Sequence, residues 1–82
     1  MRVYPNPVQD ALFLTTYSEQ TELASLQIYD VLGRIVYKQG QGLQLGDNYV
    51  EMNVSAWKNE AKQLMLQFTS PTQGVKQIKL LR

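Results

Sequence analysis

The sequence predicts an all-β sandwich of about seven short strands. Three observations support this fold class. Apolar and polar residues alternate with period two along most of the chain, turn-forming residues separate the alternating segments at the spacing typical of sandwiches, and no segment favours a helix longer than one or two turns. The 82 residues suffice for a single domain, residues 1–82, with one modest core.

Each predicted strand gains an apolar face from alternate residues. In the fourth strand, for example, Ile35 and Tyr37 are expected on one face, opposite Val36 and Lys38. Residues 55–62 (SAWKNEAK) are the best helical candidate, and we expect a loop with at most one turn there. The predicted strands are Val3–Tyr4, Ala11–Thr16, Ala24–Tyr29, Arg34–Gln39, Tyr49–Val54, Gln63–Thr69 and Val75–Leu81.

The residues between the strands identify the turns. Pro5 and Pro7 restrict the backbone near the N-terminus and predict a turn-rich corner. Asp30 can accept hydrogen bonds from the backbone donors that follow it, and Gly33 can take the positive φ that closes a tight hairpin with a bulge. Residues 39–48 (QGQGLQLGDN) predict a flexible crossover between two sheets, and residues 70–74 (SPTQG) predict a hairpin turn.

Composition argues against several classes of function. The net charge of +1 gives no reason to expect a nucleic acid or an acidic membrane surface as a partner. The chain has no cysteine and no histidine, its seven carboxylates are scattered, and no calcium-loop or phosphate-loop spacing is present. We therefore expect no catalytic residues, no metal site and no cofactor. No apolar run is long enough for a signal peptide or a membrane span, so we expect no direct membrane insertion.

Three stretches of the chain resemble the type A C-terminal sorting domain of the type IX (Por) secretion system. They are Tyr4-Pro5-Asn6-Pro7 followed by Asp10, residues 26–34 (LQIYDVLGR), and the closing Val75-Lys76-Gln77-Ile78-Lys79. The pairing of YPNP with a downstream IYDxxGR is specific, and the likeness spans almost the full chain. The resemblance implies an immunoglobulin-like antiparallel β-sandwich that forms the last part of a larger secreted multidomain protein.

The resemblance also implies a targeting module that is not itself an enzyme. Its N-terminally attached cargo would be a secreted enzyme, such as a hydrolase, or an adhesin. The cargo would pass through the periplasm to the cell surface or the extracellular space of a Gram-negative bacterium. The expected partners are the outer-membrane translocon and a sortase-like peptidase. The residues expected to carry recognition are Tyr4, Pro5, Asn6, Pro7, Asp30, Gly33, Arg34, Val75, Lys76, Ile78 and Lys79.

A carbohydrate-binding or adhesive β-sandwich module of a secreted glycoside hydrolase is the alternative interpretation. Trp57, Tyr17 and Tyr49 would stack on sugar rings if they were coplanar and exposed on one surface. Packing in the core is the competing explanation for such aromatic residues. Trp57 would then lie in the core beneath its loop, and Tyr37 would lie on a strand face beside Ile35. A purely structural spacer is a third interpretation, and it predicts no export defect when the domain is deleted.

Overall fold

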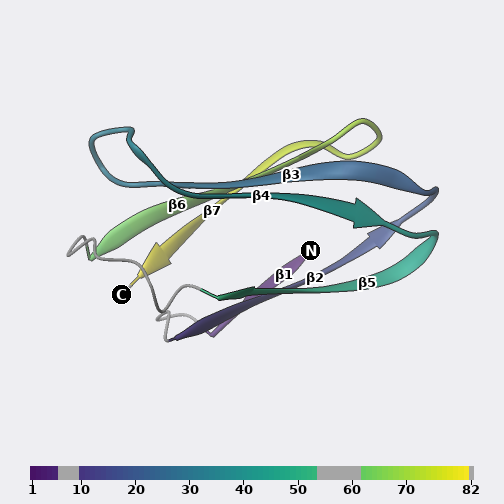
Figure 1. The fold of residues 1–82 in the computed structure, drawn as a ribbon, viewed down its shortest axis with the longest axis horizontal. Helices are drawn as coiled ribbons and strands as arrows, with labels where there is room; N and C mark the ends of the chain where they lie inside the picture. The colour runs from purple at the N-terminus through teal and green to yellow at the C-terminus, as the bar shows by residue number, and fades with distance from the viewer. Residues whose placement is uncertain (6–9, 54–61, 82) are drawn as a thin grey trace.

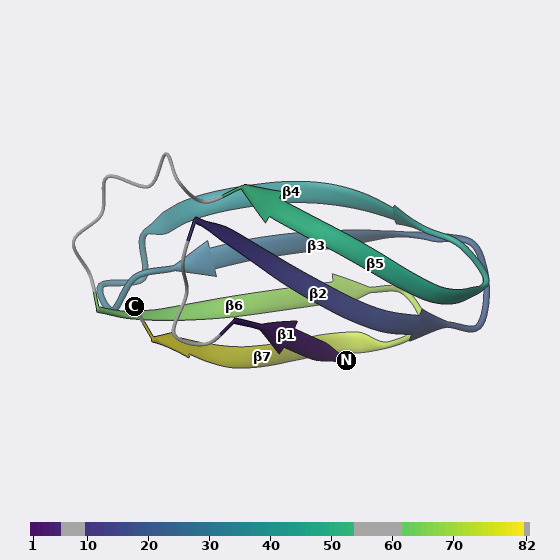
Figure 2. The same cartoon turned by 90° about the horizontal axis from the view of Figure 1, so that it is seen from below.

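The computed structural model describes residues 1–5, 10–53 and 62–81, and this part of the chain folds as two antiparallel sheets packed face to face (Figure 1). One sheet has three strands in the order β1-β2-β5, and the other has four in the order β4-β3-β6-β7 (Figure 2). The predicted all-β sandwich is confirmed. The strands are β1 (Arg2–Tyr4), β2 (Ala11–Ser18), β3 (Glu22–Tyr29), β4 (Ile35–Leu43), β5 (Gly46–Asn53), β6 (Gln63–Ser70) and β7 (Gly74–Leu81).

The strand order identifies the sandwich as immunoglobulin-like. The first, second and fifth strands share one sheet, and the third, sixth and seventh share the other, as in immunoglobulin domains. β4 joins the sheet of β3, β6 and β7, which is where variable-type domains place their additional strand after the third.

The described part of the chain contains no helix long and apolar enough to span a membrane.

The core lies between the two sheets and is built from the alternate residues of the strands. Each contributing strand turns every second side chain inward, as the period-two pattern predicts. Among the described residues, Phe68 of β6 is the largest fully buried side chain. In the part of the chain that the structure describes, the buried hydrophobic residues are Leu12, Leu14, Ala24, Leu26, Ile28, Leu43, Val50, Met52, Leu64, Leu66, Phe68 and Leu80.

The segment 39–48 crosses between the two sheets, as predicted, but it is not a flexible connection. β4 continues to Leu43 and β5 begins at Gly46, so Gln44 and Leu45 alone separate the strands. The glycines of β4 pair with β3, and Gly46 has a φ of 105° that lets the chain turn. The Asn48 side chain closes the turn, because its Oδ1 accepts from the Gln44 N–H at 2.9 Å and its Nδ2 donates to the Gln44 carbonyl at 2.9 Å.

A bulge in β4 makes the predicted assignment of Ile35 and Tyr37 to one face wrong. Ile28 pairs with Tyr37 but Tyr29 pairs with Ile35, so Val36 is an extra residue on the β4 side. Both Val36 and Tyr37 consequently pack against the core, whereas Ile35 is 53% exposed.

Polar side chains of β2 and β3 bond to the β6–β7 turn at one end of the sandwich, and the bond from β2 joins the two sheets. The Thr16 hydroxyl of β2 donates to Gln73 Oε1 in that turn at 3.1 Å. Glu22, at the start of β3, accepts from the Thr72 backbone N–H at 3.2 Å and from its hydroxyl at 2.7 Å. These bonds lower the pKa of the Glu22 carboxyl, because the Thr72 hydroxyl stabilises its ionised form.

Truncation of Leu66 tests the position of the core. Its side chain is fully buried in β6, and Leu66→Ala should lower the free energy of unfolding by about 2–5 kcal/mol. Leu23→Ala is the matched control, because Leu23 is 71% exposed and its truncation should change stability by less than about 0.5 kcal/mol. Urea unfolding followed by circular dichroism measures both changes. Equal losses in the two variants would contradict the described packing.

Candidate functional site

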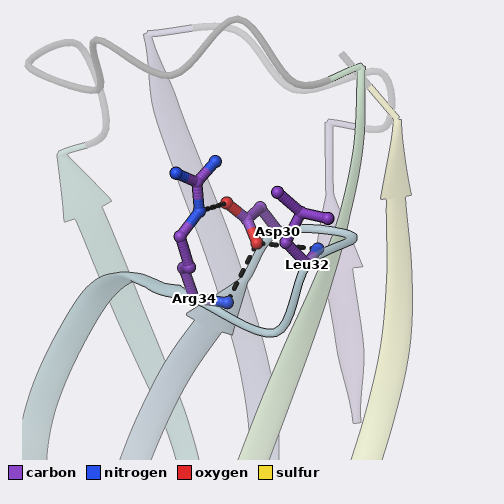
Figure 3. Close-up of polar contacts among 3 residues, drawn as sticks. All are labelled: Asp30, Leu32 and Arg34. Carbon is purple, nitrogen blue, oxygen red and sulfur yellow. Dashed lines mark hydrogen bonds and ion pairs between the residues drawn. The ribbon is translucent and has the colours of Figure 1, made fainter.

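The turn between β3 and β4, residues 30–34, is held by the side chain of its first residue (Figure 3). Asp30 is buried, with 6% of its surface exposed. Its Oδ1 accepts hydrogen bonds from the backbone N–H groups of Leu32 and Arg34, both at 2.9 Å. Its Oδ2 accepts from Arg34 Nε at 2.7 Å. Asp30 is thus a turn-forming residue, as the sequence predicts, and it fixes the next four residues in one conformation.

The backbone closes the same turn. The Asp30 N–H donates to the Arg34 carbonyl at 2.9 Å, and the Gly33 N–H donates to the Asp30 carbonyl at 3.0 Å. Gly33 has a φ of 82°, in the left-handed region that side chains with a Cβ rarely adopt. A Cβ built on Gly33 would meet no atom within 4 Å. Backbone conformation, and not space, therefore requires glycine here.

The electrostatics of the turn keep Asp30 ionised. The pKa of its carboxyl is lowered from the ordinary value of 3.8, first because the Arg34 backbone N–H bonds the ionised form, and further through the Arg34 side chain and the Leu32 N–H. Arg34 directs the rest of its side chain to solvent, with 70% of it exposed.

Within the described residues, no cluster of three or more histidine, cysteine, aspartate or glutamate side chains could hold a metal ion.

The last strand reaches the same end of the sandwich as this turn (Figure 1). Asp30, Val31, Met65 and Lys79 line a common hollow, and Met65 and Lys79 are paired across β6 and β7. The four residues of β7 expected to carry recognition divide between its two faces. Val75 and Lys79 are exposed on the outer face, whereas Ile78 packs against the core and Lys76 is half-buried, with its Nζ donating to Gln73 Oε1 at 3.2 Å.

The YPNP stretch begins in the other sheet. β1 pairs with the middle of β2, and Tyr4 stands opposite Phe13 with ring centroids 5.6 Å apart. The guanidinium of Arg2 lies 5.2 Å from the centre of the Tyr4 ring. Pro5 follows β1 directly, as an edge position permits. The expected recognition residues Asn6 and Pro7 lie outside the described residues, as do residues 55–61 of the expected loop.

Comparison with known protein families decides what kind of domain this is. A family model described as a secretion system C-terminal sorting domain matches residues 2–61, which include both the YPNP stretch and the Asp30–Arg34 turn. The chain belongs to this family. The sorting domain is a C-terminal signal for type IX secretion, a non-catalytic module that works with the secretion machinery on an attached cargo. Its destination is the cell surface or the extracellular space.

The match to the family ends before β6, so it does not include the closing stretch of residues 75–79. No curated protein and no solved structure matches the sorting domain. The placement of the closing stretch therefore comes from the structure, which brings the end of β7 beside the turn that the family model does match.

The tyrosines of the alternative interpretation lie on the outer face of the three-stranded sheet of the sorting domain. Tyr17 is 59% exposed and Tyr49 is 60% exposed, and both line a groove with Thr15 and Asp47. Phe13 lies against Tyr49, with centroids 5.7 Å apart and an interplanar angle of 22°. Trp57, the third aromatic residue of that interpretation, lies outside the described residues.

Two exposed residues of the sorting domain are not among the residues that the sequence analysis expects to carry recognition. Val31 and Leu32, at the tip of the Asp30–Arg34 turn, are 72% and 74% exposed. The sequence contains a signal for them, because the central positions of tight turns usually carry polar residues or glycine and proline. Two large aliphatic residues at these positions therefore favour a role other than stabilising the fold.

Replacement of Gly33 tests the backbone of the turn. Gly33→Val should lower the free energy of unfolding by about 1 kcal/mol or more, because a β-branched residue resists a φ of 82°. Gly40→Val is the matched control: Gly40 lies in β4 without a positive φ, and a Cβ there also meets no atom within 4 Å. Valine favours strands, so the control should keep or raise stability. Thermal unfolding that affects both variants equally would contradict this account of the turn.

The carboxylate of Asp30 should make stability depend on pH. Its pKa in the folded chain lies below the ordinary value, so the unfolded chain takes up the proton first as the pH falls. The contribution of Asp30 is therefore fully present above pH 3.8 and is lost as the pH falls through the lower folded value. Asp30→Asn should be less stable at neutral pH and should lose less stability on acidification. Parallel loss in wild type and variant, measured by urea unfolding across this range, would show that Asp30 contributes no pH dependence.

Proposed function

We propose that the sorting domain, residues 1–82, directs an N-terminally attached enzyme or adhesin through the outer-membrane translocon of the type IX system to the cell surface. The observation that carries this proposal is the family match over residues 2–61, which contains the YPNP stretch and the Asp30–Arg34 turn. The periplasm is the compartment of transit, and a sortase-like peptidase removes the domain after translocation. A hydrolase is one class of cargo that such a domain would carry.

The geometry supports recognition of a folded surface. Side chains that point into the core of a sandwich are committed to packing, so a partner can contact only the outer faces, the edges and the turns. Among the residues expected to carry recognition, Arg34, Val75 and Lys79 are exposed, and a partner can bind them directly. Asp30 and Gly33 act by shaping the turn, and Ile78 acts by holding β7 on the core.

A carbohydrate-binding module remains the second candidate, because Tyr17 and Tyr49 are both exposed beside the carboxylate of Asp47. Aromatic faces next to hydrogen-bonding groups are a common arrangement in sites for small ligands. This function requires no contact with the secretion machinery, so a fusion experiment separates the two candidates.

Transfer of the domain to a reporter tests the proposed function. Residues 1–82, joined through a short linker to the C-terminus of a periplasmic reporter, should move the reporter to the surface of a bacterium that has a type IX system. Protease accessibility on intact cells measures the surface fraction. The reporter without the domain, and the fusion in a strain that lacks the translocon, are the controls. A fusion that stays in the periplasm of the competent strain would refute the sorting function and leave the carbohydrate-binding candidate.

A further inference from the structure

The tip of the Asp30–Arg34 turn presents two aliphatic side chains in a fixed position. Val31 and Leu32 are 72% and 74% exposed, although neither the fold nor the turn requires an apolar residue there. The turn beneath them is ordered by the Asp30 carboxylate, which accepts from both the Leu32 and Arg34 N–H groups. Binding of a partner to this tip would therefore cost little conformational entropy, because the tip is already ordered.

The apolar surface continues from the tip onto the outer face of the four-stranded sheet. Tyr29 pairs with Ile35 on one side and with Met65 on the other, so the three side chains form a row across β4, β3 and β6. Ile35 is 53% exposed, and Tyr29 and Met65 are half-buried. Leu81, at the end of β7, is 44% exposed. Tyrosine and methionine are among the residues enriched at protein interfaces.

Cations surround this surface. Arg34 exposes 70% of its side chain, and Lys62 and Lys79 are exposed beside the start of β6 and the end of β7. The carboxylate of Asp30 is buried beneath them and is already bonded within the turn. The groups offered outward among these residues are thus aliphatic and positive, and they complement an apolar pocket with carboxylates on its rim.

We propose that Val31 and Leu32, with Ile35, Met65 and Leu81, form a docking surface for a protein of the type IX machinery. In this proposal, Val31 and Leu32 insert together into an apolar pocket of that protein, and carboxylates at the rim of the pocket contact Arg34 and Lys79. The inference rests on the proposed function and names the surface through which it operates. A protein is favoured over a lipid bilayer because the tip is small and rigid and the chain has a net charge of only +1.

A pair of serine substitutions tests the docking surface in the reporter fusion. Val31→Ser with Leu32→Ser should reduce the surface fraction of the reporter about tenfold or more, as expected for loss of a central apolar anchor. The matched control is Leu23→Ser with Leu45→Ser, because these residues are 71% and 66% exposed and lie away from the tip, at the start of β3 and in the β4–β5 connection. The control pair should export as well as the wild-type domain.

Three further measurements make the outcome decisive. Thermal unfolding of the purified domain should give the same midpoint for both serine pairs and wild type; if the tip pair lowers the midpoint, Val31→Thr with Leu32→Gln replaces it. Export of a wild-type fusion should fall when free domain is overproduced in the periplasm, and free domain with the tip pair should not compete. Sedimentation with vesicles of phosphatidylethanolamine and phosphatidylglycerol should be equal for wild type and the tip pair.

Normal export of a folded tip variant, while the wild-type fusion reaches the surface, would overturn the docking surface and leave the sorting function standing. Failure of the wild-type fusion itself would refute both. Vesicle binding that is lost with the tip pair would assign the surface to lipid and would also overturn the proposal.

Discussion

The alternation of side chains across each strand is the constraint on which the rest of the structure depends. Because successive side chains point to opposite faces, each strand that supplies the core also presents a row of residues to the outside. In β7, for example, Leu80 is fully buried, whereas Lys79 and Leu81 on either side of it are exposed. In a domain of this size, the inward rows are needed for stability. The outward rows and the turns are therefore where a secretion component can recognise the fold.

The two ends of the sandwich differ in what their polar side chains do. At the end with the β6–β7 turn, the polar side chains of Glu22 and Thr16 bond to that turn, and the Thr16 bond ties the two sheets together. At the other end, the polar side chain of Asp30 is turned inward to order a turn whose tip is aliphatic. The first arrangement satisfies polar groups within the fold. The second leaves apolar area exposed, which a stable fold alone does not explain.

The sequence predicts the number and type of the strands because the apolar residues that form the core recur with period two. It also predicts the Asp30 turn, since aspartate and glycine have specific backbone roles at its first and fourth positions. It does not predict that β4 and β5 extend through Gly40, Gly42 and Gly46, because glycine has a weak strand preference and the pairing with β3 and β2 supplies the order. A bulge in this hairpin and two apolar residues at the tip of its turn can be predicted from the sequence, but the position of the bulge at Val36 depends on how the turn meets the sheet, and a linear pattern does not contain that information.

In the proposed function, the secretion machinery recognises the folded surface of this domain and not its sequence as an extended peptide. The most direct test is the location of a reporter whose attached domain carries Leu26→Ala together with Leu66→Ala, since both side chains are fully buried and their loss should unfold the domain while every exposed residue is kept. Circular dichroism of the purified variant establishes that it is unfolded. This reporter should stay in the periplasm, where it is detected through its own folded domain. Export of the unfolded variant at the wild-type level would contradict recognition of the folded surface.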